Sequence, residues 1–216
     1  LGALVRHRMT ASDPIIARDI PVLHEAMKNV AHLTVRNRGT FCGSVCHADP
    51  AAEMPMMALL LDGVVHIAGS SNERSVSAAE FLTGSLTNAL EPDEMVTAID
   101  IAKPAANAGW GFAEFARRHG DYALAAVAVV LDRVEGTARN VRIAVMGVGE
   151  IASRIAPAEA VLESRVPDAA VIAEAVAELR AAVEPMSDLS ASADYRRHLV
   201  GALAARVIAE AWERAA

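Results

Sequence analysis

Residues 36–55, RNRGTFCGSVCHADPAAEMP, are the stretch around which the rest of the chain is organised. Nowhere else in the sequence do small, polar and acidic residues lie so close together. Gly39 and Gly43 allow a backbone to approach a ligand closely, and the hydroxyls of Thr40 and Ser44 add donors for phosphate or carbonyl oxygens. Two acidic residues later in the stretch have carboxylates that can accept hydrogen bonds. This mixture predicts a ligand-binding site rather than a structural turn.

Length and composition limit the classes of protein to which this chain can belong. A chain of 216 residues can form one large domain or two small ones, and 53% hydrophobic residues suffice for a packed core. Aromatic residues make up 4%, so the core is aliphatic and few rings are free to stack on bases. A formal charge of -7 would repel a phosphate polyanion. We therefore expect a globular protein that does not bind nucleic acid.

Neither a membrane span nor a secretion signal is visible in the sequence. The apolar run at residues 122–131 is much shorter than the roughly 18 residues that a membrane helix needs. The chain holds two cysteines, which favours a reducing compartment over a disulfide scaffold. We expect a cytoplasmic protein. The first residue is Leu1 rather than Met, and we interpret this as a sign of a longer parent chain, although processing would look the same.

Short helices and strands alternate over the first hundred residues. The pattern predicts a strand at residues 1–5, a turn near residue 13, and a helix that Asp19 caps and Pro21 opens. A buried helix is predicted over residues 54–61, and Ser77 with Glu80 forms a capping box. Further strands are predicted at residues 64–68, 74–76 and 95–101.

Residues 103–109 have the composition of a linker, and we place a domain boundary there. Beyond it, three extended runs at residues 110–116, 124–134 and 141–148 predict an antiparallel meander. Helices are predicted to cover this sheet. They are a short one at 158–162, one between Pro167 and Pro185, and a last one with apolar residues every four positions from residue 195 to 211.

Stretch 36–55 resembles the second flavin-contacting segment of the FAD-binding subunit in the molybdenum hydroxylases, the carbon monoxide dehydrogenase and xanthine dehydrogenase family. In that family an RNRGT-x-GG-S/N run precedes a DPAAD/E-x-P run. Other family landmarks recur in order along essentially the whole chain. They are an FF-x-G to P-x-E run at residues 81–94, a GF-x-x-FARR-x-GDYA run at 111–123, a G-V-G run at 147–149 and an S-A-x-YRR-x-L run at 192–199.

The resemblance implies an α+β fold with two domains. Residues 1–104 would be the C-terminal part of a mixed α/β FAD-binding domain of the PCMH-like type, incomplete at its N-terminus. Residues 105–216 would form a three-stranded antiparallel sheet covered by helices. Family members begin with a further piece whose glycine-rich turn holds the FAD pyrophosphate. That piece is not among these 216 residues, so we expect residues 1–216 alone to hold FAD poorly.

The resemblance also implies a set of cofactor-binding residues, with no catalytic residue and no metal ligand in this chain. Residues 40–44 would lie along the phosphates and ribityl chain of FAD, and Asp49 and Glu53 would reach its polar groups. Leu90 would offer its backbone to the ring, near which the loop at residues 117–122 is also expected. The implied residues are Thr40, Phe41, Cys42, Gly43, Ser44, His47, Asp49, Glu53, Leu90, Arg117, Asp121 and Tyr122.

Cys42 departs from the family pattern, which normally has glycine at this position. A side chain there would cost roughly 1–2 kcal/mol if the backbone φ were positive. Either the turn tolerates the side chain or flavin binding is tuned. The departure leaves the contact from Cys42 open and does not affect the one from Gly43.

Other interpretations of the same residues compete with flavin binding. Cys42, Cys46, His47 and Asp49 could bind a metal, but three residues between the cysteines do not suit a c-type haem and no second ligand pair exists for zinc. Two small buried thiols are the simpler alternative. Asp49 could also cap a helix, and the loop at 117–122 could be a charged hairpin turn. No hydrolytic triad or Rossmann fingerprint is present.

Two functions remain. In the first, the chain is the FAD-binding electron-transfer subunit of a molybdenum hydroxylase and passes electrons from iron–sulfur clusters to an external acceptor. Its partners would be a small subunit with two-iron two-sulfur clusters and a large subunit with the molybdenum cofactor, and a dimer of such heterotrimers is one expected arrangement. In the second, the chain is a cofactor-free assembly subunit of the same fold. The sequence names neither the substrate of the complex nor the acceptor.

Overall fold

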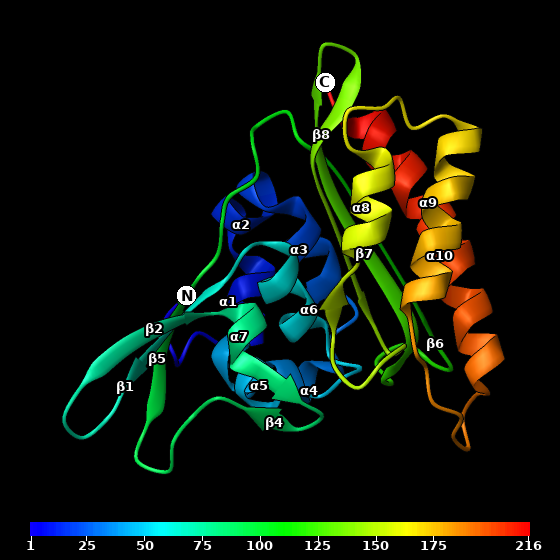
Figure 1. Ribbon diagram of the computed structural model, residues 1–216. Helices are drawn as coiled ribbons and strands as arrows, with labels where there is room; N and C mark the ends of the chain where they lie inside the picture. The colour runs from blue at the N-terminus through cyan, green and yellow to red at the C-terminus, as the bar shows by residue number, and fades with distance from the viewer.

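The apolar run that begins at Ala123 becomes the central strand of the larger of the two main sheets (Figure 1). In the computed structural model, which describes residues 1–216, strand β7 (Ala123–Val134) pairs antiparallel with β6 (Gly109–Ala116) and β8 (Thr137–Met146). The predicted meander is confirmed. A fourth strand, β9 (Ser153–Arg154), extends the sheet beyond β8. Strand β9 has only two residues, too few to show an alternating pattern, so we did not predict it from the sequence.

Both faces of β7 are buried, which explains why its sequence is apolar without alternation. Ala126 and Ala128 belong to the core on the side of the N-terminal helices, and Val127 and Val129 belong to the core on the side of the C-terminal helices. All four are fully buried. The sheet is therefore the middle layer of three.

Helices from the two ends of the chain cover opposite faces of this sheet (Figure 1). On one face lie α8 (Ala156–Leu162), α9 (Ala169–Ala182) and α10 (Ala193–Arg214). On the other face, α3 (Pro21–Met27) packs against β6 and α6 (Glu53–Leu60) packs against β7 and β8. Every residue of α6 is buried, as expected for a helix that is apolar all round. The predicted α+β class and the covering helices are confirmed.

Close packing of α10 on β6 depends on glycines in the strand. A Cβ added at Gly109 would lie 1.9 Å from the carbonyl oxygen of Ala211, which is backbone and cannot move aside alone. We predict that Gly109→Ala lowers the free energy of unfolding by about 1–3 kcal/mol, the usual cost of overpacking. Denaturant unfolding measures this. Gly149→Ala is the control, because the nearest atom to its added Cβ would be 3.6 Å away, and equal losses in the two variants would contradict the prediction.

The N-terminal hundred residues contain short elements around a second sheet of order β2-β1-β5. Here β1 (Val64–Ala68) pairs antiparallel with β2 (Glu73–Ser77) and β5 (Met95–Asp100). The three strands were predicted, and the pairing of β5 with β1 was not. The capping box of Ser77 and Glu80 is confirmed at the start of the next helix. The remaining elements are α1 (His7–Ser12), α2 (Pro14–Asp19), α4 (Leu33–Arg36), α5 (Phe41–His47), α7 (Ala78–Phe81), β3 (Leu82–Gly84) and β4 (Thr87–Asn88).

Two predictions for the first twenty residues were wrong, and a third, the turn near residue 13, missed the helices on either side of it. The strand at residues 1–5 is reduced to one β-bridge from Gly2 to Ala98. The predicted turn near residue 13 joins two six-residue helices, because Asp13 accepts a hydrogen bond from the amide of Ile15 at 2.7 Å and caps the second. Asp19 does not cap the helix that Pro21 opens; it pairs with Arg18 and Lys103 instead.

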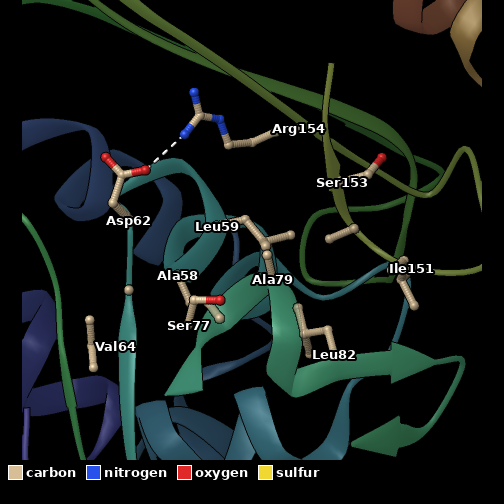
Figure 2. A pocket seen from close by; sticks show the side chains of 13 residues that line it. Ala58, Leu59, Asp62, Val64, Ser77, Ala79, Leu82, Ile151, Ser153 and Arg154 are labelled. Atoms are coloured by element: carbon tan, nitrogen blue, oxygen red, sulfur yellow. Dashed lines mark hydrogen bonds and ion pairs between the residues drawn. The ribbon is translucent and has the colours of Figure 1, made fainter. Parts of the chain in front are cut away.

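Asp62 links the two halves of the chain electrostatically. It lies in the turn between α6 and β1, and its carboxylate pairs with Arg142 of β8 at 2.9 Å and with Arg154 of β9 at 2.8 Å. Figure 2 shows the pair with Arg154 at the rim of a hollow. Of the linker predicted at residues 103–109, residues 103–108 form no helix or strand, and Gly109 already begins β6. None of the helices is both apolar enough and long enough to cross a lipid bilayer.

Candidate functional site

Within the glycine-containing stretch, residues 41–47 form helix α5 where we expected a turn around Cys42. Thr40 is the N-cap of α5, and its hydroxyl accepts a hydrogen bond from the amide of Gly43 at 3.0 Å. The amide of Phe41 donates to the carbonyl of Val5 at 3.0 Å, which ties the start of the helix to the N-terminal segment. A side-chain cap of this kind stabilises a helix by about 1 kcal/mol. One cap and buried apolar residues are therefore enough to order the stretch.

The helix sorts the predicted contacts into two groups. Thr40, Gly43, Ser44 and His47 follow the i, i+3, i+4, i+7 spacing of one helical face, and all four are at least partly exposed. Phe41 and its neighbour Cys42 face the core instead. Only the first group is accessible to a ligand, Thr40, Ser44 and His47 through their side chains and Gly43 through its backbone.

Cys42 carries none of the strain that a left-handed backbone would cause. It lies inside the helix, is 2% exposed, and is absent from the residues with positive φ. Burial raises the pKa of its thiol, and burial together with the nearby Cys42 sulfur raises the pKa of Cys46 to about 11. Both are free cysteines, and no group of three or more potential metal ligands occurs in the structure. Cys42 is a small core residue here.

Asp49 closes a turn and does not cap a helix. Its carboxylate accepts a hydrogen bond from the amide of Ala51 at 2.8 Å, and α6 begins four residues later with Ala52 as its N-cap. The helix-cap alternative for Asp49 is therefore wrong. The acid is half-buried at the surface just beyond the C-terminal end of α5.

Leu90 is connected to α5 through Asn88. The side chain of Asn88 donates to the carbonyl of Cys46 at 2.7 Å and accepts from the amide of Leu90 at 2.9 Å. The β3–β4 hairpin therefore lies against the C-terminal end of α5, which Figure 1 also shows. Leu90 itself is partly buried against the core.

Tyr122 meets Asp49 across a pocket of about 290 Å³. The loop at residues 117–122 joins β6 to β7, and Gly120 within it packs against Ala31 and His32, just before helix α4. Partial burial, and then the charge of Asp49, raise the pKa of Tyr122. Arg117 and Asp121 flank this tyrosine on the same loop with exposed side chains. The structure thus unites Tyr122 with Asp49, and it shows no bond from Arg117 or from the carboxylate of Asp121.

Glu53 has an acidic neighbour that the sequence analysis missed. Glu53 is 9% exposed at the start of α6, and burial, followed by the charge of Asp49, raises its pKa to about 7. Burial and the charge of Glu53 raise the pKa of Glu114 on β6 to about 8. One carboxylate oxygen of Glu114 is buried without a hydrogen-bond partner. A glutamate at an inward position of a mostly apolar strand was the available signal.

An apolar hollow of about 380 Å³ lies elsewhere, between α6, α7 and the loop before β9 (Figure 2). Leu59, Leu82 and Ile151 point towards it, and none of the predicted site residues lines it. The chemistry-bearing groups therefore gather at the other end of α6. They form the exposed face of α5, the Asp49 turn and the Tyr122 loop, which we call the α5 site.

Comparison with protein families gives two matches that together cover nearly the whole chain. Residues 1–104 match the FAD-binding domain in molybdopterin dehydrogenase, and residues 110–211 match the carbon monoxide dehydrogenase flavoprotein C-terminal domain. The first match carries FAD binding as its defining property and contains α5 and the Asp49 turn. FAD is the cofactor of this chain.

Characterised relatives and solved structures agree with these matches. The chain is 40% identical over 217 residues to the nicotine 6-hydroxylase medium subunit of Paenarthrobacter nicotinovorans, covering 99% of this chain and 75% of that protein. A chain of carbon monoxide dehydrogenase from Hydrogenophaga pseudoflava superposes with a TM-score of 0.97 at 33% identity, covering 100% of this chain and 75% of that one.

Quinoline 2-oxidoreductase from Pseudomonas putida 86 superposes with a TM-score of 0.93 at 39% identity, covering 99% of this chain and 74% of the matched one. These proteins are subunits of dehydrogenases and hydroxylases, and this chain spans about three quarters of their length. Identity at this level over so much of both chains establishes more than a shared fold. The chain belongs to the FAD-binding medium subunits of the carbon monoxide dehydrogenase and molybdenum hydroxylase family of oxidoreductases.

Proposed function

We propose that this chain carries electrons, through FAD, from iron–sulfur clusters on a small partner subunit to an external acceptor. Molybdenum chemistry on a large partner subunit would supply the electrons. The observation that supports this most strongly is the α5 site, because four of the implied contacts share one accessible helical face beside an acid and a tyrosine. We propose the cytoplasm as the location of the protein, because two free cysteines remain thiols in this reducing compartment.

The residues present suit FAD. A Cβ built at Gly43 would meet Thr40 alone, so the space outside this part of α5 is open for a flat or extended ligand. Hydroxyls of Thr40 and Ser44 can donate to phosphate or ribityl oxygens, and the carboxylate of Asp49 can accept from hydroxyls. Phe41 and Cys42 can contribute through the backbone only, because their side chains are buried. Bound FAD supplies the two-electron redox chemistry, and these residues hold and orient it.

Other implied residues are assigned by their position around this face. We propose that Leu90 borders the flavin through its backbone, and that Arg117, Asp121 and Tyr122 approach the ring from the β6–β7 loop. A charge or an aromatic ring near the flavin tunes its reduction potential. We keep the division into a FAD-binding domain at residues 1–104 and a C-terminal domain at residues 105–216 as part of this proposal.

Partner subunits are expected because a medium subunit or medium chain, as the characterised relatives are called, is one part of a larger complex. We predict that the natural protein elutes in one complex with iron and molybdenum, consistent with the naming of its relatives as medium subunits or medium chains. Size-exclusion chromatography with metal analysis of each fraction tests this. A metal-free monomer or homodimer that keeps its activity would refute the prediction.

The cofactor-free alternative makes a different prediction for the same preparation. An assembly subunit would co-elute with iron and molybdenum but would carry no flavin. Extraction of FAD from the pure complex, quantified against protein, separates the two functions. The accessible glycine and hydroxyl groups on α5 favour the flavin-binding function.

A further inference from the structure

Arg196 of α10 connects three segments that are distant in sequence. One of its terminal nitrogens donates to the carbonyl oxygens of Leu124 at 2.8 Å and Gly147 at 2.9 Å, and the other donates to the carboxylate of Asp188 at 2.7 Å. Arg196 is only 7% exposed, and its Nε atom has no hydrogen-bond partner. A buried guanidinium is costly unless it is well paired, so this arrangement calls for an explanation.

The two carbonyls that Arg196 holds belong to the backbone behind the α5 site. Gly147 has a φ of +76° and donates from its amide to the carbonyl of Pro50 at 2.8 Å, next to Asp49. Leu124 lies two residues after Tyr122 at the start of β7. Arg196, Asp188, Tyr122 and Asp49 all line the pocket of about 290 Å³.

We propose that Arg196 is a positioning residue that fixes Asp49 and Tyr122 for FAD by holding the backbone at Gly147 and Leu124. The proposal rests on the proposed function. A guanidinium suits this role because its planar fork reaches a carbonyl at the start of β7, a carbonyl just after β8 and a carboxylate on a loop at the same time. A lysine ammonium is a compact point charge and cannot span the same three acceptors in fixed directions.

The test compares Arg196→Lys with Arg197→Lys in the purified complex. Arg197 is the neighbouring arginine on α10, pairs with Asp194 at 3.3 Å on the surface, and does not line the pocket. After removal and restoration of flavin, we expect the FAD dissociation constant of Arg196→Lys to rise about tenfold or more, with a shifted flavin absorption band and midpoint potential. Arg197→Lys should keep the wild-type values. Asp188→Asn, which weakens the hold on Arg196 with less disturbance to folding, should raise the dissociation constant in the same direction by a smaller factor.

A purely structural Arg196 would give a different pattern. Its variant would lower the melting temperature while leaving the dissociation constant, the absorption band and the potential unchanged, and this result would overturn the inference. If Arg196→Lys does not assemble into the complex, Asp188→Asn decides. The inference would be overturned if Asp188→Asn kept the wild-type FAD dissociation constant, absorption band and midpoint potential. Absence of FAD from the wild-type complex would instead refute the proposed function, so the two failures are distinguishable.

Discussion

Replacing Gly43 with valine is expected to remove most of the FAD from the purified complex. A Cβ at this position would lie 2.7 Å from the hydroxyl oxygen of Thr40, so the valine must displace the residue that caps α5. The branched side chain would also stand on the accessible helical face beside Ser44. This side chain would overlap the space that the flavin needs, and a steric cost of about 1–3 kcal/mol in the bound state weakens FAD binding roughly 5- to 150-fold.

Flavin per protein after gel filtration measures this effect. Gly136→Asn is the matched control, because Gly136 lies in the β7–β8 turn at the opposite end of the molecule from α5 (Figure 1). Its φ of +76° is one that asparagine tolerates, and no atom lies within 4 Å of an added Cβ. An unchanged flavin ratio in Gly43→Val would rule out the contact between FAD and this face of α5.

The pair of Glu53 and Glu114 is expected to make the protein less stable as the pH rises. The pKa of Glu53 is raised to about 7 and that of Glu114 to about 8, in both cases chiefly by burial. The unfolded chain releases these protons near pH 4.5, so between pH 4.5 and 8 the folded state binds more protons. Each group then lowers the free energy of unfolding by at most about 1.4 kcal/mol per pH unit.

Glu114→Gln should remove the larger share of this dependence. At pH 5 the variant and the wild type should unfold at similar denaturant concentrations, because Glu114 is then protonated in the folded state. At pH 9 the variant should be more stable by up to about 4 kcal/mol, an upper bound since water reaches part of the side chain. Glu178→Gln on the exposed face of α9 is the control. If the free energies of unfolding of Glu114→Gln and the wild type changed with pH in parallel, the pKa of Glu114 would not be raised in the folded state.

Periodic apolar patterns predicted the elements that carry most of the packing. The stripe that follows Pro21, the uniformly apolar α6 and the strands β6, β7 and β8 were all identifiable, because burial on one or two faces leaves a strong repeat. The capping box at Ser77 was identifiable because both of its partners are close in sequence. Such local signals need no knowledge of the rest of the fold.

Elements stabilised by distant contacts could not be predicted in this way. Helix α5 contains Gly43 and two cysteines, which are weak helix formers, and it is ordered by the Thr40 cap and by burial of Phe41. The raised pKa of Glu114 depends in part on the charge of Glu53, sixty-one positions earlier in the chain. Sequence spacing contains no information about such pairs.

The candidate site, too, was predictable only in part. Resemblance supplied Thr40, Gly43, Ser44, Asp49 and Tyr122 as residues of one site, and the structure places the first three on one helical face and the last two around one pocket. It gave no role to Arg196, although the YRR run had been noted. The role depends on the carbonyls of Leu124 and Gly147, and backbone acceptors leave no trace in a sequence.

The FAD content of the natural complex tests the central claim most directly. The pure complex is denatured, the released flavin is identified and quantified by chromatography, and iron and molybdenum are measured in the same fractions. Our account predicts about one FAD for each copy of this chain, together with both metals, on the binding stoichiometry of a single cofactor site. A homogeneous complex that contains iron and molybdenum but no FAD would contradict it and would favour the cofactor-free assembly subunit.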